Sequence, residues 1–217
     1  KETFVYYETL KNRYPNVRIL TWKKEFNYSA INNFAVREAQ GEYLLFLNND
    51  VEIITENWLE EMLQLCQQKD VGMVGAKLYY PDDTIQHAGV VVGLGGVAAH
   101  VLCKLPRDAE GYMGRLRCVQ EISAVTAACM MVKTSVFKAV GGFDEELKVA
   151  FNDIDLCMKV RKYGVKIVFT PYAELYHYES KSRGMEDTPE KQLRFSREVN
   201  CFRRKWEREL LKGDPYY

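Results

Sequence analysis

The most constraining feature of the chain is residues 42–52, EYLLFLNNDVE, where an apolar run ends abruptly in a polar cluster. The run at 43–47 is short and continuous, which is typical of a strand buried on both faces of a parallel sheet. Ligands of open α/β sheets bind at the carboxyl ends of the strands. The segment therefore predicts that Asn48, Asn49, Asp50 and Glu52 meet a ligand. The same residues are also typical of a simple polar turn, and that alternative stays open at this point.

Asp50 is a candidate metal ligand because it supplies a carboxylate at the predicted strand end. Mg²⁺ and Mn²⁺ prefer oxygen ligands and are usually bound by one or two carboxylates together with substrate phosphates. Such a site needs few ligands from the protein, so a single aspartate in the cluster is compatible with it.

Composition places the chain among ordinary globular proteins. Its 217 residues, 47% of them hydrophobic, are enough for one large core, and a single α/β domain is the simplest fit. Lysine plus arginine and aspartate plus glutamate both number 30, so nothing in the charge balance indicates a nucleic-acid partner. The six cysteines form no CxxC pair, and no apolar run is long enough to cross a bilayer. We therefore expect a reducing, cytoplasmic location.

Short apolar runs alternate with amphipathic helical patterns, as in βαβ proteins. Helices are predicted at 3–13, 28–39, 55–66, 134–140, 152–163 and 189–212, and strands at 17–22, 43–47, 71–78, 121–132 and 165–170, where Pro171 ends the last strand. A helix in first place is unusual for an α/β sheet. We therefore expect the natural protein to begin upstream, with a first strand that this chain lacks.

Acidic and capping residues begin two of the predicted helices. Asp153 and Asp155 lie in the first turn of one helix, where exposed amides and the helix dipole stabilise negative charge. Asn27 and Ser29 precede another helix and are typical N-terminal caps. For all four residues, plain capping and a role in ligand binding both remain open.

A polar loop follows the last predicted strand and contains His177, Lys181 and Arg183. The histidine is a candidate ligand for a metal or a phosphate, and the two cations are candidates for clamping phosphate oxygens. A lone loop histidine usually has neither role, so the sequence alone leaves its function open.

A glycine-rich segment at 89–100 offers a different function, because Gly93, Gly95 and Ala98 formally match the dinucleotide fingerprint GxGxxA. That fingerprint requires a full helix behind the glycines and an acidic residue after a second strand. Pro106 ends any such helix early, and the next acids, Asp108 and Glu110, lie in a polar loop. A glycine-rich hairpin or loop is the favoured interpretation, and a nicotinamide-dependent oxidoreductase is the weaker alternative.

The last predicted helix is capped by Thr188 and has Pro189 at its first position. Residues 190–212 carry an apolar stripe and eight Lys or Arg against four Glu. We therefore divide the chain into a main domain at 1–187 and an amphipathic helix at 188–217. The stripe is expected to pack on the domain or on a missing partner segment, with peripheral contact to an anionic membrane as a further possibility.

Seven short motifs occur in one order along the chain: NYSAINN (27–33), AQG (39–41), LNND (47–50), TAAC (126–129), GGFD (141–144), NDID (152–155) and the stretch 177–184. As a set they resemble the family-2 inverting glycosyltransferases of the GT-A fold, in particular the bacterial rhamnosyltransferase-like branch. The resemblance implies an α/β fold of GT-A type, Rossmann-like, with a mixed, mostly parallel sheet flanked by helices and missing its first strand.

The resemblance also implies a reaction. The expected activity is metal-dependent transfer of a sugar, with inversion, from a nucleoside-diphosphate sugar to an acceptor hydroxyl of a growing polysaccharide or surface glycan, as in bacterial cell-wall synthesis. The acceptor would be a glycan or a lipid-linked molecule at the inner face of the membrane. A non-catalytic nucleotide- or sugar-binding module is the alternative.

Site residues follow from the same resemblance. The resemblance implies that Asp153 is the general base. It implies that Asp50 and His177 bind the metal, Mg²⁺ or Mn²⁺. Asp50 is the main ligand, because Asn48 stands at the first position of the DxD-like motif. The implied donor-binding residues are Asn27, Ser29, Asn33, Asn48, Asn49 and Arg183. The implied acceptor-side residues are Asn152, Asp155 and Ala128.

Overall fold

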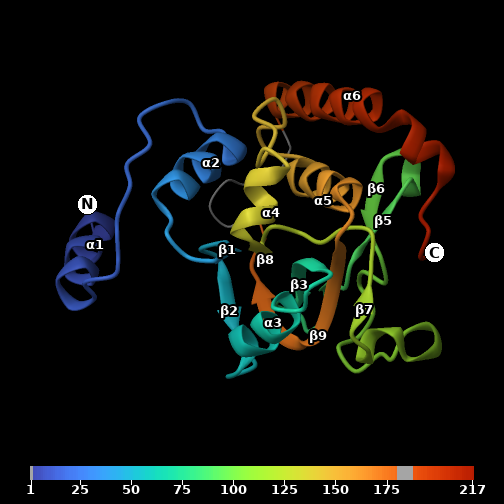
Figure 1. Cartoon of the computed structure of the whole chain (residues 1–217), viewed down its shortest axis with the longest axis horizontal. Helices are drawn as coiled ribbons and strands as arrows, with labels where there is room; N and C mark the ends of the chain where they lie inside the picture. The colour runs from blue at the N-terminus through green and yellow to red at the C-terminus, as the bar shows by residue number, and fades with distance from the viewer. Residues whose placement is uncertain (1, 180–187) are drawn as a thin grey trace.

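The chain folds into a seven-stranded mixed sheet with helices on both faces (Figure 1). The computed structural model describes residues 2–179 and 188–217. The helices are α1 (Glu2–Arg13), α2 (Tyr28–Glu38), α3 (Trp58–Cys66), α4 (Thr134–Ala139), α5 (Asn152–Tyr163) and α6 (Pro189–Lys212), with short 3₁₀ helices at Leu94–Gly96 and Tyr112–Arg117. The strands are β1 (Tyr43–Leu47), β2 (Val51–Ile53), β3 (Val71–Tyr79), β4 (Ile85–His87), β5 (Val90–Val92), β6 (Ala98–His100), β7 (Gln120–Glu121), β8 (Cys129–Lys133) and β9 (Lys166–His177). The predicted α/β class is confirmed.

The strand order is β1-β8-β3-β9-β2, with β4 beside β3 and β7 beside β9. Of the pairings in the described sheet, only β3 with β9 is parallel, and the others are antiparallel. The mixed character of the sheet was therefore predicted correctly, but its parallel share is smaller than expected. An apolar run cannot distinguish the two kinds of pairing here, because helices cover both faces of the sheet and bury antiparallel strands as well.

Side chains of the central strands alternate between two cores, one on each face of the sheet. Met131 of β8 lies in the core that contains Met62 of α3. Its neighbour Met130 lies in the opposite core, together with Phe137 of α4 and Phe202 of α6. The last helix thus contributes to the main core, while the predicted boundary at 187 lies outside the described residues and stays a prediction.

Strand β9 is longer than predicted, because it runs through Pro171 to His177. Phe169 pairs with Gly75, but the next pair along the same two strands is Glu174 with Lys77, so the intervening residues of β9 bulge out of the ladder. Proline has no N–H to donate and is tolerated at such a bulge. The prediction that Pro171 ends the strand is wrong, and the extension carries His177 to the far end of the sheet.

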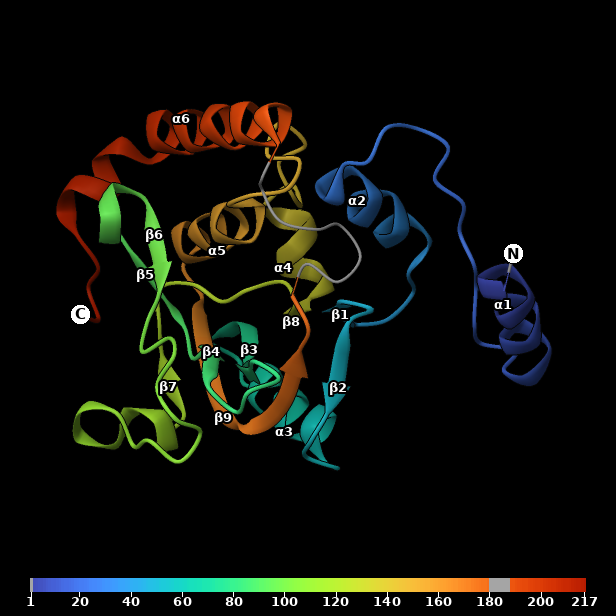
Figure 2. The same ribbon diagram turned by 180° about the vertical axis from the view of Figure 1, so that it is seen from behind.

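The amino-terminal part of the chain lies apart from the sheet. Helix α1 forms as predicted, but none of its residues is buried, and Figures 1 and 2 both show it well separated from the other elements. The strand predicted at 17–22 is absent, and these residues form no regular element. A strand requires partners for its backbone groups, and the described sheet offers none to this segment.

The glycine-rich segment is a β-hairpin formed by β5 and β6, which pair in antiparallel register from Val90–His100 to Val92–Ala98. Gly93 and Gly95 have φ values of 95° and 65°, which glycine adopts without strain. Only a three-residue 3₁₀ helix follows Gly93, so the dinucleotide-binding alternative lacks its helix and is wrong.

Two further expectations concern the thiols and the membrane. The six cysteines are free, and Cys66, Cys129 and Cys157 are buried. Among the described helices, none combines the length and the apolar character needed to cross a bilayer.

Candidate active site

A cleft of about 500 Å³ opens where the segments that follow β1 and β9 meet the start of α5. Its lining side chains are Phe26, Tyr28, Asn48, Asn49, Asp50, Thr126, Ala127, Ala128, Val149, Asn152, Asp153, His177 and Glu179. Seven residues predicted from the sequence are among them: Asn48, Asn49, Asp50, Ala128, Asn152, Asp153 and His177. Segments distant in sequence thus bring the predicted metal ligands and the predicted base to one cavity.

Asp50 and His177 lie side by side at one wall of this cleft. Val51, the first residue of β2, pairs with His177, the last residue of β9. This pairing places His177 Nε2 3.3 Å from Asp50 Oδ1, and both side chains are nearly buried, with exposed fractions of 11% and 13%. An octahedral ion holds adjacent ligand atoms about 3 Å apart, given metal–ligand distances of about 2.1 Å. The two atoms therefore fit one divalent ion.

Gln86 fixes which nitrogen of His177 is available. The Gln86 Nε2 group faces two acceptors, the backbone oxygen of His177 at 3.3 Å and Glu179 Oε2 at 3.4 Å. Its Oε1 must then face His177 Nδ1, 2.7 Å away, so that nitrogen carries the proton. Nε2 then has no proton and can accept from Asn48 Nδ2, 3.2 Å away, while Asp50 Oδ1 lies 3.3 Å from it. Burial lowers the pKa of His177, with the Asp50 charge opposing, and the ring is neutral and able to bind a metal.

The cleft is strongly acidic. Asp50, Asp153 and Glu179 contribute carboxylates, and no lysine or arginine is among the described residues that line it. The part of the chain that the structure describes contains no group of three or more His, Cys, Asp or Glu placed to hold a metal. Among the described residues of the cleft, Asp50 and His177 are the pair that could hold a divalent ion, and oxygens of a bound diphosphate could complete its coordination. This is the arrangement expected for Mg²⁺ or Mn²⁺.

Asp153 faces the cleft from the first turn of α5. Its Oδ2 accepts a hydrogen bond from the Ala127 amide at 3.2 Å, and its Oδ1 accepts one from the Ile154 amide at 2.8 Å. The Tyr28 hydroxyl lies nearby and donates to the Ala127 oxygen at 3.2 Å. Burial, and after it the Asp153 charge, raises the pKa of Tyr28, so this hydroxyl is a neutral donor. Tyr28 was missed, although it stands between the two caps singled out in the sequence.

Asp155 does not line the cleft, contrary to its predicted acceptor-side position. It is fully buried on the other side of α5, because residues two apart on a helix are separated by about 200°. Its Oδ1 accepts a hydrogen bond from Trp206 Nε1 at 2.8 Å and lies 2.8 Å from Lys205 Nζ. Lys159 Nζ lies 3.3 Å from its Oδ2. Asp155 therefore ties α5 to α6.

The residues predicted to bind donor from α2 instead hold the loop before α5. Asn27 caps α2 by accepting from the Ala30 amide, and it donates to the Glu145 oxygen at 2.9 Å. Ser29 is buried and donates to the Leu147 oxygen at 2.6 Å. The Asn33 side chain both donates to and accepts from the Phe143 backbone, each at 3.0 Å. None of Asn27, Ser29 and Asn33 lines the cleft. Arg183 lies outside the described residues.

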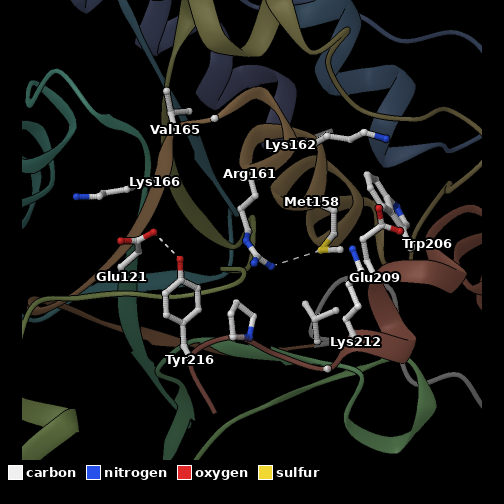
Figure 3. A pocket seen from close by; sticks show the side chains of 14 residues that line it. Glu121, Met158, Arg161, Lys162, Val165, Lys166, Trp206, Glu209, Lys212 and Tyr216 are labelled. Atoms are coloured by element: carbon white, nitrogen blue, oxygen red, sulfur yellow. Dashed lines mark hydrogen bonds between the residues drawn. The ribbon is translucent and has the colours of Figure 1, made fainter.

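A second cavity, of about 690 Å³, lies between the end of α5, the end of α6 and the segment after it (Figure 3). Arg161 and Tyr216 point into it, and Tyr216 donates to Glu121. This cavity is larger than the acidic cleft but contains none of the predicted site residues. Size alone does not identify the site, and the converging carboxylates and histidine favour the smaller cleft.

Comparison with known proteins agrees with the geometry. The model of the glycosyltransferase-like family matches residues 13–198. The chain is 52% identical over its whole length to an uncharacterised protein of Sinorhizobium fredii, y4gI, and 41% identical over 94% of its length to the O-antigen biosynthesis protein RfbC of Myxococcus xanthus. It spans 24% and 16% of the lengths of these two relatives.

A similar fold occurs in a crystal structure of GalNAc-T7 with UDP, GalNAc and Mn²⁺, with a TM-score of 0.66 at 14% identity. The alignment covers 87% of this chain and 38% of that one. The structure thus has the GT-A architecture that the sequence motifs predicted. Because the family model covers most of the chain from Arg13 onward, the chain belongs to the family-2 glycosyltransferases.

Proposed function

We propose that the protein transfers a sugar from a nucleoside-diphosphate sugar to an acceptor hydroxyl, with inversion at the anomeric carbon. The observation that carries this proposal is that a candidate metal-binding pair and a candidate general base line the same acidic cleft. Asp50 and His177 are paired at 3.3 Å on one wall, and Asp153 reaches the same cavity from α5. Two carboxylates in one site can then have different tasks, one on a metal and one accepting a proton.

Asp50 and His177 would hold a divalent ion, with Gln86 keeping the His177 tautomer in place. When bound, that ion supplies positive charge for the diphosphate, which the acidic lining of the cleft would otherwise repel. Asn48 and Asn49 are the remaining donor-side candidates that line the cleft. Their amides can donate hydrogen bonds to phosphate or sugar oxygens.

Asp153 is proposed as the general base. The acceptor oxygen attacks the anomeric carbon, its proton passes to the Asp153 carboxylate, and the bond from the anomeric carbon to the diphosphate oxygen breaks. The amides of Ala127 and Ile154 hold the carboxylate towards the cleft. Asn152 and Ala128 line the cleft beside it, which supports the proposal that they contact the acceptor.

The broader context is proposed to be the synthesis of a bacterial surface polysaccharide on the cytoplasmic side of the membrane. The O-antigen biosynthesis protein among the relatives supports this class of product. UDP with Mn²⁺ is the first donor-side pair to test, because both occur in the similar structure.

A screen of donor hydrolysis across nucleotide sugars, with Mn²⁺ and Mg²⁺ in parallel, tests the proposal on the full-length protein. Metal-dependent release of nucleoside diphosphate from one donor is the expected result. Metal-dependent binding of a nucleoside diphosphate without turnover of any donor, even with acceptor glycans added, would instead favour a non-catalytic binding module.

Helix α6 is proposed to contact an anionic membrane through its outer face. Phe202 and Trp206 bury the apolar face of this helix in the domain, while Arg197, Arg204 and Arg208 are exposed. Binding would therefore be electrostatic. Co-sedimentation with vesicles containing phosphatidylglycerol should fall at least about tenfold when the three arginines are replaced by glutamine, since each basic residue near an anionic surface contributes about 1 kcal/mol.

A further inference from the structure

We propose that Glu198 of α6 is a positioning residue, which holds the loop in front of α5 so that Asp153 points into the cleft. The inference rests on the role proposed above for Asp153. Glu198 does not itself line the cleft. Figures 1 and 2 both show α6 lying alongside α5, so a side chain of α6 can reach the loop that enters α5.

The Glu198 carboxylate is buried, with 3% of the residue exposed, and it accepts hydrogen bonds from two successive backbone amides. Its Oε1 accepts from the Val149 amide at 3.1 Å, and its Oε2 accepts from the Ala150 amide at 2.8 Å. Hydrogen bonds to an ionised acceptor are stronger than neutral ones, and a buried carboxylate is retained where such bonds compensate for its lost hydration.

The two amides that Glu198 accepts from directly precede a residue with a strained backbone. Phe151, the residue before α5, has φ 60° and ψ 5°, a left-handed conformation that is unfavourable for a residue with a side chain. Its ring packs on Phe195 and Phe202 of α6, with centroids 5.7 and 5.4 Å away. Helix α6 thus holds both the backbone and the side chain of this turn.

The start of the same loop is held separately by α2. The Tyr28 amide donates to the Lys148 oxygen at 2.8 Å, and Ser29 donates to the Leu147 oxygen. Glu198 holds the next two residues, Val149 and Ala150, and Val149 lines the cleft. The end of the loop and the first turn of α5, including Asp153, therefore depend on α6.

Small displacements at this position have large consequences for turnover. A general base must lie within hydrogen-bond reach of the proton that it accepts, and a misplacement of about 1 Å can cost about a hundredfold in rate. Asp50 and His177 lie on other elements and do not contact Glu198 in the described structure. The loss of the Glu198 grip is therefore expected to affect turnover much more than binding of the donor diphosphate.

The test compares Glu198→Gln with Glu207→Gln, an exposed glutamate on the same helix. Glutamine keeps the size of the side chain but turns an N–H towards one of the two amides. Hydrogen exchange at Val149 and Ala150 should become at least about tenfold faster in Glu198→Gln and stay unchanged in Glu207→Gln, because a tenfold change needs only about 1.4 kcal/mol. Turnover, measured as UDP release from a UDP-sugar, should fall at least tenfold, with affinity for UDP and Mn²⁺ within twofold.

A second mutant pair separates this inference from the proposed function. In an Asp153→Asn background, Glu198→Gln should cause no further loss of turnover, because both changes act through the same group. Unchanged amide exchange and turnover in Glu198→Gln, while Asp153→Asn is inactive, would overturn only the positioning role. Parallel loss of UDP affinity, melting temperature and turnover would overturn it in favour of general destabilisation. Full turnover in Asp153→Asn would remove both proposals.

If Glu198→Gln does not fold, Glu198→Asp, which keeps the charge but is one methylene shorter, serves for the same measurements.

Discussion

His177 Nε2 lies 3.3 Å from Asp50 Oδ1, although the two residues stand at the ends of segments far apart in the sequence. The antiparallel pairing of β2 with β9 brings them together, and the bulge at Pro171 allows β9 to reach that far. The proposed metal site therefore depends on the sheet as much as on the DxD-like motif.

Replacement of Asp50 by alanine should abolish Mn²⁺-dependent UDP binding while the fold stays intact. The backbone oxygen of Asp50, which accepts from the Tyr178 amide at 2.8 Å, is retained in the variant. We expect at least about a tenfold loss of affinity by calorimetry, equivalent to about 1.4 kcal/mol. Asp82→Ala, in an exposed turn, is the control. Unchanged Mn²⁺-dependent affinity in Asp50→Ala would remove Asp50 from the metal site.

Gln86→Leu should weaken Mn²⁺ binding about 10- to 100-fold, the usual cost of losing a residue that orients a metal ligand. The change removes the acceptor for His177 Nδ1–H and lets the ring adopt the other tautomer. Gln64→Leu, on the exposed side of α3, controls for the loss of an amide side chain. Equal Mn²⁺ affinities of the two variants, measured by titration calorimetry, would contradict the assigned tautomer.

Asp153→Asn should reduce turnover about a hundredfold or more, with UDP affinity nearly kept, because general-base catalysis contributes about that much. Asp155→Asn should instead lower the free energy of unfolding by up to about 3 kcal/mol, since it removes the buried negative charge that Lys159 and Lys205 contact. Steady-state kinetics and urea unfolding distinguish the two effects. A folded, donor-binding but inactive Asp155→Asn beside an active Asp153→Asn would transfer the base assignment to Asp155.

Asn33→Ala should destabilise the protein without weakening UDP binding. The variant loses the hydrogen bonds to the Phe143 backbone, each worth about 1 kcal/mol, so we expect a loss of about 1–3 kcal/mol in the free energy of unfolding. Urea unfolding and UDP calorimetry measure the two effects. A loss of UDP affinity at unchanged stability would restore Asn33 to the donor site.

Stability should fall below about pH 6.5 because of His87. Burial, followed by the charges of His100 and His177, lowers the pKa of His87 well below its ordinary value. Below about pH 6.5 the unfolded chain binds a proton that the folded protein does not, so the free energy of unfolding decreases by about 1.4 kcal/mol per pH unit until the folded pKa is reached. Above the unfolded pKa neither state binds this proton, so His87 causes no loss of stability there.

His87→Gln provides the measurement. The difference in unfolding free energy between the natural protein and this variant should be constant above about pH 7.5 and should shrink as the pH falls below the unfolded histidine pKa of about 6.5. A difference that stays constant down to pH 5 would show that the folded pKa of His87 is ordinary.

The sequence by itself determined the family, the kind of fold and most elements of secondary structure, because these depend on local signals. Helix α5 ends at Gly164, which is left-handed, and α6 begins with the cap Thr188 and Pro189, as the capping rules predict. The motifs also marked Asp50 and Asp153 as candidate site residues, because a strand end and a helix start are recognisable without any tertiary contact.

Only the tertiary structure decided which of the marked residues share a site. Asn27, Ser29 and Asn33 have the sequence context of ligand-binding residues, but long-range contacts direct them to the loop before α5. Asp153 and Asp155 are both aspartates in the first turn of α5, and they differ only in the side of the helix that each one occupies. Gln86 and Glu198 carry no local signal, because their roles arise from partners distant in the chain. Such contacts are set by the packing of whole elements, which spacing along the sequence does not encode.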